Sequence, residues 1–531
     1  MADPTRHRQP GLLAAWLLLL AVFVALRFDS SERTYFQVDD QVVVWLVDDA
    51  VNNGNWQPDW GRAENAAPER EGYFAAEAER TDIPHAHHYN FALHMMLSAA
   101  IIKPLRELGV TAPTITLLHH IALFWDAVSL LFLVLAARQL GSTTALAFTA
   151  ALLYSVFPLA VQGSHYARPD ALLTAMGSAL LWLALAKTRL PQWLWLATSG
   201  LALGIATGGK ASQLMLGIFP AITCCSVLLQ AEQRHWRTLA AIAASGSALL
   251  LLVGLVLGLM FVAGDIHPRD FWLSLLSVQR YYEHPAPPDT LEHYSYLAQL
   301  LNIGDYFRAT LGWPLLLAML AGAFSLAQRA DKLPLLLLTV PLLFFTAYFA
   351  SVPAFFDRSF SALAAAIVLL AGCGLHAIIR AIPRLPAKPV CATLLAIAAS
   401  WQPLQIQFHL QTDHLRHHHN DDRLAFQKAL KERLSKKTGV DFWIKNIDRG
   451  DLFGRTLPEK PPKNPRIYVL EDLNDWNSRE YRAELLANGF VQVAEFTGDF
   501  ADMPTNSLIT VHEAARFHYF VRRDEWPGDL P

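Results

Sequence analysis

The chain has 531 residues, of which 53% are hydrophobic and only 17% are charged. Soluble proteins carry about 25% charged residues, so this composition argues against a soluble protein and indicates that much of the chain faces lipid. The formal net charge of −3 provides no overall basic field, which argues against nucleic acid as a partner.

Uncharged stretches about 20 residues long, enough to cross a ~30 Å hydrocarbon core, recur along the chain and predict about eleven transmembrane helices. The first, 11–26, follows Arg6 and Arg8 and lacks a convincing cleavage site, so we expect a retained anchor rather than a cleaved signal peptide. The other predicted spans are 114–137, which is interrupted only by Asp126, and the uncharged runs 139–164, 171–186, 190–209, 211–231, 238–264, 309–328, 333–356, 359–379 and 389–408.

Basic residues collect in every second loop between these spans. They are Arg138, Lys187, Arg189, Arg234, Arg237, Arg329, Lys332, Arg380, Arg384 and Lys388. Because cytoplasmic loops retain positive charge, this pattern predicts an integral plasma (inner) membrane protein with a cytoplasmic N-terminus and an extracytoplasmic C-terminal region. The apolar run 91–102 is too short to cross comfortably, and we expect an interfacial helix along the outer leaflet. If it crosses, the topology of all later segments inverts.

The chain therefore divides into a transmembrane part, 1–412, with a long first extracytoplasmic loop over 28–113, and a second part over 413–531. The second part has the pattern of a small extracytoplasmic α/β domain. Its expected helices are 421–437 and 478–487, and its expected strands are 466–470, 490–496 and 517–521.

An acidic pair, Asp39 and Asp40, follows the first span within the sequence FQVDDQVVVWL. Its apolar neighbours are expected to hold the pair at the bilayer surface. There a carboxylate can take a proton or bind a cation. The alternative is a solvated helix start, because acidic residues favour the first turn of a helix.

Further charged residues lie at the predicted outer face. Arg168 and Asp170 flank Pro169, which suits a helix N-terminus, and Asp170 either caps that helix or belongs to a site. Lys210 ends an apolar run, and Arg358 separates two apolar runs. A lone cation at an interface usually extends its charge to water, whereas several that converge would bind a phosphate.

Histidine clusters at 85–88 and 417–419 have spacings compatible with metal binding, although neither has the complete ligand pattern of a known site. The sequence establishes no cofactor, and a divalent metal ion at His85 and His88 is the candidate. His87 is the third histidine of the first cluster. Asp126 lies within a predicted span and is expected to face the bundle interior, as a structural or a chemical group.

The order of these features resembles the GT-C superfamily of membrane glycosyltransferases, especially the branch of protein O-mannosyltransferases and bacterial aminoarabinose transferases. The resemblance rests on the Asp39–Asp40 pair, the HYARPD segment at 165–170, the GLALGIATGGK segment at 200–210 and Arg358 before a late span. It covers roughly residues 10–410.

The resemblance implies a GT-C-like membrane domain and a sugar donor linked to a polyprenyl phosphate, transferred to a lipid, glycan or protein acceptor. It implies that Asp39 is the general base, that Asp40 supports it and that Asp170 positions the acceptor or the base. Arg168, Lys210 and Arg358 would stabilise the leaving phosphate, and an in-line displacement would invert the anomeric centre.

Two other classes of function are compatible with a chain of this kind. A transporter or flippase would place ionisable groups or broken helices near the membrane midplane, where Asp126 is the clear example. A noncatalytic assembly or sensor protein would use the C-terminal region as its binding module. The crowding of polar groups at one membrane surface favours the enzyme.

Overall fold

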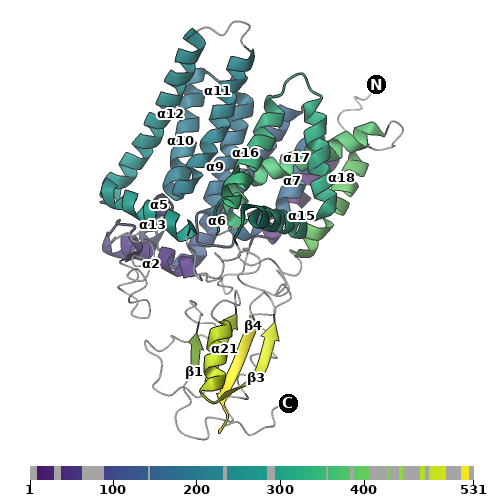
Figure 1. Cartoon of the computed structure of the whole chain (residues 1–531). Helices are drawn as coiled ribbons and strands as arrows, with labels where there is room; N and C mark the ends of the chain where they lie inside the picture. The colour runs from purple at the N-terminus through teal and green to yellow at the C-terminus, as the bar shows by residue number, and fades with distance from the viewer. Residues whose placement is uncertain are drawn as a thin grey trace.

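The computed structural model describes residues 9–28, 38–61, 89–141, 144–230, 236–283, 294–353, 357–382, 388–406, 429, 442–445, 467–472, 478–497 and 516–524. Most of these residues form helices packed side by side, and the C-terminal residues form a small sheet (Figure 1). Both histidine clusters and nearly all of the predicted helix 421–437 lie outside the described residues.

The first half of the helical part contains α1 (Gln9–Ala25), α2 (Val38–Asn53), α5 (Ala92–Glu107), α6 (Thr114–Leu140), α7 (Thr144–Ser155), α8 (Pro158–Gly163), α9 (Asp170–Ala186), η3 (Lys187–Arg189) and α10 (Gln192–Gly209). The second half contains η4 (Ala211–Gly217), α11 (Ile218–Gln230), α12 (Trp236–Ala263), α13 (Pro268–Glu283), α15 (Tyr296–Ala327), α16 (Leu333–Ala350), η5 (Asp357–Leu363), α17 (Ala364–Ala381) and α18 (Lys388–Ala399).

Within the described residues, six helical segments are long and apolar enough to cross a membrane, which makes the chain an integral membrane protein. They are Thr114–Leu140, Asp170–Arg189, Trp236–Ala263, Tyr296–Ala327, Leu333–Ala350 and Arg358–Ala381. Shorter apolar helices cover Leu13–Ala25, Thr144–Ser155 and Ala211–Ser226. Eleven crossings stay a prediction.

Two predicted spans, 211–231 and 359–379, begin as the 3-10 helices η4 and η5 and continue as α11 and α17. Two others differ from the structure at proline and glycine. The run 139–164 is divided into α7 and α8, because Pro158 has no N–H for the helix ladder and disfavours helical geometry at Phe157. The run 309–328 is the second half of α15, which begins earlier at Tyr296 and bends at Gly312, whose φ is +74°. The first half of α15 therefore occupies part of the expected outer loop.

Helices α15 and α17 cross at a pair of glycines. A Cβ atom on Gly374 would lie 1.7 Å from the carbonyl oxygen of Ala318, and one on Gly322 would lie 2.0 Å from that of Leu370. No larger residue fits at either position without moving a backbone. Small residues let helix backbones approach closely inside a membrane, where packing rather than hydrophobic burial holds helices together.

The predicted interfacial helix is present as α5, and the structure packs it against protein. Its Met95, Ala99 and Ile102 share one apolar cluster with Val43 and Val47 of α2. On another side, Leu93 fills the space left by Gly208 of α10, where an added Cβ would lie 2.8 Å from a Leu93 methyl group. The run is therefore apolar because neighbouring helices bury much of it.

The described C-terminal residues form a four-stranded sheet of β1 (Phe442–Lys445), β2 (Ile467–Asp472), β3 (Phe490–Thr497) and β4 (Arg516–Arg522), with helix α21 (Ser478–Ala487). The strand order is β1-β2-β4-β3; β1 is parallel to β2, and the other pairs are antiparallel. Helix α21 packs on β3 and β2 through Leu485, which joins Phe490 and Phe520 in a small core. The helix and three strands match the prediction, while β1 was not predicted.

Two of the basic loops are fixed by contacts with neighbouring helix ends. Arg329, between α15 and α16, donates from Nη1 to the carbonyl oxygen of Leu140 at the end of α6 over 2.8 Å. The Lys187 Nζ atom lies 4.6 Å from the ring centroid of Trp195, near the start of α10. In Figure 1 the sheet and α21 lie on the side of the bundle that carries α2 and α13.

Candidate functional site

A six-residue link, 164–169, joins α8 to α9 and carries the HYARPD segment into the protein interior. Arg168 is completely buried and Asp170 is 3% exposed. Their side chains form an ion pair, with Arg168 Nε 3.4 Å from Asp170 Oδ2. The structure therefore brings together two of the predicted site residues, in a place where water does not screen their charges.

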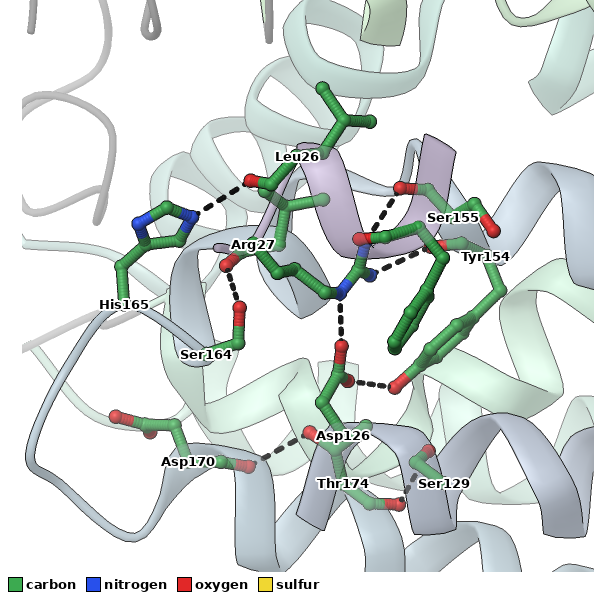
Figure 2. A network of polar contacts seen from close by, with 12 residues as sticks. Leu26, Arg27, Asp126, Ser129, Tyr154, Ser155, Ser164, His165, Asp170 and Thr174 are labelled. Carbon is green, nitrogen blue, oxygen red and sulfur yellow. Dashed lines mark hydrogen bonds and ion pairs between the residues drawn. The ribbon is translucent and has the colours of Figure 1, made fainter. Parts of the chain in front are cut away.

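Helix α9 begins directly at Asp170. Pro169 precedes it with φ −72°, the angle that its ring imposes, and its carbonyl oxygen accepts a hydrogen bond from Leu173 N over 2.9 Å. Thr174 Oγ1 donates to the carbonyl oxygen of Asp170 over 2.8 Å. In Figure 2 the Asp170 carboxylate points away from Asp126, and its Oδ2 accepts no hydrogen bond from the described residues. This carboxylate oxygen can therefore accept a hydrogen bond from a bound molecule.

Arg168 is held by contacts that suit a delocalised cation. Its guanidinium carbon lies 4.6 Å from the ring centroid of Tyr166, within the range of a cation–π contact. A buried arginine keeps its charge, so it needs compensating groups such as this ring and the Asp170 carboxylate. A fixed positive charge in a low-dielectric interior is suited to binding a phosphate.

Two histidines fix the link from different sides. His165 Nε2 lies 2.9 Å from the carbonyl oxygen of Leu26, just after α1, as Figure 2 shows. His94 Nε2, from α5, lies 2.7 Å from the carbonyl oxygen of Ala167. Sequence reasoning missed His94. Its signal was a single histidine within the apolar run ALHMMLSAAII, which would need a polar partner if buried.

Lys210 follows the last residue of α10, close to the beginning of α9. A Cβ atom on the preceding Gly209 would lie 3.3 Å from a methyl group of Leu173 and 3.6 Å from one of Leu172. The Lys210 carbonyl oxygen accepts a hydrogen bond from Gln213 N over 2.8 Å, which starts the 3-10 helix η4. The predicted cation at the TGGK sequence therefore belongs to the same region as Asp170.

Arg358 lies in η5, which packs against both α8 and α9. The contact with α9 is close, because a Cβ atom on Gly177 would lie 1.9 Å from the carbonyl oxygen of Ala362. A glycine at this position of α9 lets the backbone of η5 lie directly on the helix. The third predicted cation is thus on an element that borders the HYARPD link.

Asp39 and Asp40 lie in the first turn of α2, and the structure describes their backbone but not their side chains. Farther along α2, Asp48 Oδ1 accepts a hydrogen bond from Thr114 Oγ1 over 2.5 Å. Arg106 Nη2 donates to the same hydroxyl group over 3.0 Å. These bonds tie α2 to the end of α5 and the start of α6, and so fix the helix that carries the acidic pair.

The comparisons with known proteins support the arrangement of these elements. The family model for dolichyl-phosphate-mannose-protein mannosyltransferases matches residues 96–261, a region that includes Arg168, Asp170 and Lys210. The structure of the Archaeoglobus fulgidus oligosaccharyltransferase, in complex with Zn and sulfate, superposes with a TM-score of 0.52 at 12% sequence identity, covering 94% of this chain and 74% of that one.

Two structures of ArnT from Cupriavidus metallidurans match over nearly their whole length. The apo structure gives a TM-score of 0.50 at 13% identity and covers 98% of this chain and 100% of that one. The structure bound to undecaprenyl phosphate gives a TM-score of 0.50 at 11% identity and covers 98% of this chain and 99% of that one. The chain has the GT-C fold. No curated protein matches it by sequence.

The GT-C fold agrees with the resemblance inferred from the acidic pair, the HYARPD link and the two later cations. At 11–13% identity the structural likeness establishes the fold alone, and the matched family region ends before Arg358 and begins after Asp40. Donor and acceptor must therefore be argued from the site residues.

A second polar network in this GT-C domain lies beside the link (Figure 2). Arg27 Nε pairs with an Asp126 carboxylate oxygen, and the Tyr154 hydroxyl donates to the other. Arg27 also donates to the carbonyl oxygens of Ser155 over 2.8 Å and Tyr154 over 3.2 Å. Asp126 thus faces the bundle interior, as predicted, and these partners tie α1, α6 and α7 together.

The metal prediction falls on residues that the structure does not describe, because His85 and His88 lie within 62–88. Among the described residues, no group of three or more histidine, cysteine, aspartate or glutamate side chains is arranged to hold a metal ion. The described candidate residues are the cations Arg168, Lys210 and Arg358, which would suit a phosphate, and Asp170, whose carboxylate can accept a proton or a hydrogen bond.

Proposed function

We propose that this protein is a membrane glycosyltransferase that moves a sugar from a polyprenyl-phosphate donor to an extracytoplasmic lipid, glycan or protein acceptor. The observation that carries the proposal is the buried Arg168–Asp170 ion pair, at the point where α8, α9, α10 and η5 meet. Ionisable groups are rarely buried in a membrane domain without a role, and this pair has a carboxylate oxygen that accepts no hydrogen bond from the described residues, which supports a binding site there.

In the proposed reaction, the Asp39 carboxylate takes the proton of the acceptor hydroxyl or amine group. The freed electron pair attacks the anomeric carbon, and the bond from that carbon to the phosphate oxygen breaks on the opposite face. The polyprenyl phosphate leaves with the bonding electrons, and the anomeric centre inverts. Asp40 supports Asp39, while Asp170 positions the acceptor or the base.

The leaving group gains negative charge as its bond to the sugar breaks. Arg168, Lys210 and Arg358 are proposed to stabilise that charge. Arg168 is already held in place by Tyr166 and Asp170, so little reorganisation is needed when the phosphate charge develops. Guanidinium N–H groups that are fixed in advance do not have to be oriented during the reaction. This arrangement therefore stabilises the transition state more than the bound lipid-linked sugar.

A lipid-linked donor agrees with the fold neighbours and the location of the site. ArnT of the same fold binds undecaprenyl phosphate, a polyprenyl phosphate, and the matched family model is named for a dolichyl-phosphate sugar. A donor whose chain stays in the bilayer must be met at the membrane surface, where the predicted topology puts α2, the link and Lys210. The proposal assigns no step to a metal ion.

The test is sugar transfer by the purified protein in lipid nanodiscs. Radiolabelled polyprenyl-phosphate sugars are offered with a panel of lipid, glycan and peptide acceptors, and the wild type is compared with Asp39→Asn. We expect transfer that the substitution lowers about 10²-fold or more, as for loss of a general base, while donor binding persists. The same assay with a chelator decides whether a divalent metal ion is required.

Asp49→Asn is the matched control, because it makes the same change farther along α2, where Asp49 accepts a hydrogen bond from Asn53 over 2.8 Å. Equal transfer rates for the wild type and Asp39→Asn would refute the assignment of the base. Absence of transfer by wild-type protein with every donor, while it still binds polyprenyl phosphate, would favour a transporter or a noncatalytic binding protein.

A further inference from the structure

His94 of α5 is hydrogen-bonded to the link, and it takes part in none of the steps proposed above. His94 is 3% exposed. Helix α5 has 16 residues and is too short to be counted among the candidate membrane spans. Burial lowers the pKa of His94 to about 4, opposed by the hydrogen bond to Ala167, so the ring is neutral at neutral pH. Because the carbonyl oxygen only accepts, the hydrogen of the neutral ring is assigned to Nε2.

The bond from His94 fixes one particular peptide plane. The Ala167 carbonyl group belongs to the planar unit that also contains the N–H of Arg168. On the far side of Arg168, Pro169 has its φ locked and α9 begins at once. With both ends held, the φ and ψ angles of Arg168 have little freedom, and the direction in which its side chain leaves the backbone is set by these neighbours.

Helix α5 also contacts the other elements that carry predicted site residues. It packs on α2 in the apolar cluster that contains Ala167 itself, and Arg106 near its end is bonded through Thr114 to Asp48 of α2. Through Leu93 it touches Gly208, two residues before Lys210. One helix thus contacts α2, which carries the acidic pair, the link that carries Arg168, and α10 two residues before Lys210.

We propose that His94 is a positioning residue, which through its hydrogen bond to the Ala167 carbonyl group holds Arg168 and Asp170 at a fixed separation from α2 and Lys210. The inference deepens the proposed function and rests on it. A rigid helix keeps the general base and the phosphate-binding arginine apart by a constant distance, and a misplacement of about 1 Å can cost ~10²-fold in rate.

Two substitutions separate the hydrogen bond from the packing. His94→Leu fills much of the same volume without a donor, whereas His94→Gln retains an N–H near the position of Nε2. We expect kcat to fall about 10–100-fold in His94→Leu, with a smaller change in KM for the donor, and to return to within about threefold of wild type in His94→Gln. If His94 were merely structural, loss of its N–H group would lower the protein yield, and the folded His94→Leu and His94→Gln proteins would have the same kcat.

His376→Leu is the matched control for a lost histidine. His376 Nε2 lies 3.4 Å from Thr149 Oγ1, also between two helices, but near the end of α17 that is remote from η5. We expect its kcat to equal that of the wild type. A second readout is hydrogen exchange of the peptide that spans 164–173, which should quicken in His94→Leu and slow again in His94→Gln.

A double substitution tests the route through Arg168. If His94 acts by positioning Arg168, then adding His94→Leu to Arg168→Lys lowers kcat less than the two single effects combined. Full kcat in a well-folded His94→Leu protein, or unchanged exchange of the 164–173 peptide, overturns the positioning role. If the wild type transfers no sugar, the proposed function fails, and the exchange experiment still decides whether His94 holds the link.

Discussion

Arg27, just after α1, pairs with Asp126 near the middle of α6, and the two side chains are 0% and 1% exposed. Tyr154 of α7 donates to the same carboxylate, so the pair joins α1 to the neighbouring helices α6 and α7. A transporter would keep such a pair accessible to its substrate or to protons. Here Arg27 and Asp126 bond to each other, Arg27 also donates to backbone carbonyl groups, and Asp126 accepts from the Tyr154 hydroxyl group. The pair is thus part of the frame beside the link.

Breaking this pair from one side should destabilise the protein more than removing both partners. Arg27→Leu or Asp126→Leu leaves an uncompensated buried charge and is expected to cost about 3–5 kcal/mol, while the double substitution costs less than either. Thermal unfolding in detergent measures the effect. Arg308→Leu is the control, since its pair with Asp305 is 50% and 61% exposed and should contribute about 0–1 kcal/mol. Strictly additive single effects would contradict the pairing.

Neutralising Asp170 should lower the rate of transfer. Asp170→Asn keeps the size of the side chain but removes the charge that faces the buried Arg168, so we expect kcat to fall about 10²-fold in the nanodisc assay. Asp331→Asn makes the same change at an exposed residue that accepts a hydrogen bond from Leu333 N, in a basic loop remote from η5. A rate in Asp170→Asn that matches the Asp331→Asn rate would remove Asp170 from the site.

The α15–α17 crossing should tolerate no side chain at its glycines. Gly374→Ala would put a Cβ atom 1.7 Å from the Ala318 carbonyl oxygen, so the helices must separate at a cost of about 1–3 kcal/mol or more. Gly258→Ala in α12 is the comparison, because nothing lies within 4 Å of an added Cβ there and stability should rise by about 0.5–1 kcal/mol. Unfolding temperatures of the two variants, measured in the same detergent, should move in opposite directions.

Acid should weaken the fold through His94. Its pKa is lowered from 6.5 to about 4 by burial, so the folded state binds this proton less tightly than the unfolded state does. The contribution of neutral His94 to the free energy of unfolding is complete above pH 6.5. It is lost as the pH falls toward about 4, and the loss is up to about 3 kcal/mol. Unfolding free energies measured across that window should depend less on pH in His94→Gln than in the wild type.

Reporter fusions can test the predicted orientation. Alkaline phosphatase fused after Pro531 should be active and green fluorescent protein fused there should be dark, because the positive-inside rule puts the C-terminal region outside. Fusions in the loop that contains Arg329 and Lys332 should behave in the opposite way. An active phosphatase in that basic loop would invert the topology and move the site to the cytoplasmic face.

The sequence alone predicted the features that depend on local composition. Apolar runs of about 20 residues predicted helices such as α6, α12 and α16, because a helix of that length and apolarity has a stable place only in lipid. The patterning of apolar residues also predicted three strands and α21. Two of the differences within the membrane part came at Pro158 and Gly312, where one residue changes the backbone path without changing the apolarity of the run.

The candidate site was predicted as a list of charged residues and not as an arrangement. Asp170 and Arg168 are neighbours in the sequence, but their burial depends on α5, η5 and α10, which come from distant segments. His94 was missed because a single histidine in an apolar run has the same local pattern whether it bonds to a carbonyl group or not. The sequence likewise could not predict the partner of Arg27, because Asp126 is 99 residues away.

For this protein, then, the sequence by itself determined that the chain enters a membrane, roughly where its helices lie and which polar residues need partners, because those properties follow from the transfer of each segment between water and lipid. Only the tertiary structure decided which partners they have. Hydrogen bonds and ion pairs act over a few ångströms, so the bond between His94 and Ala167 exists only where close helix packing brings α5 against the link.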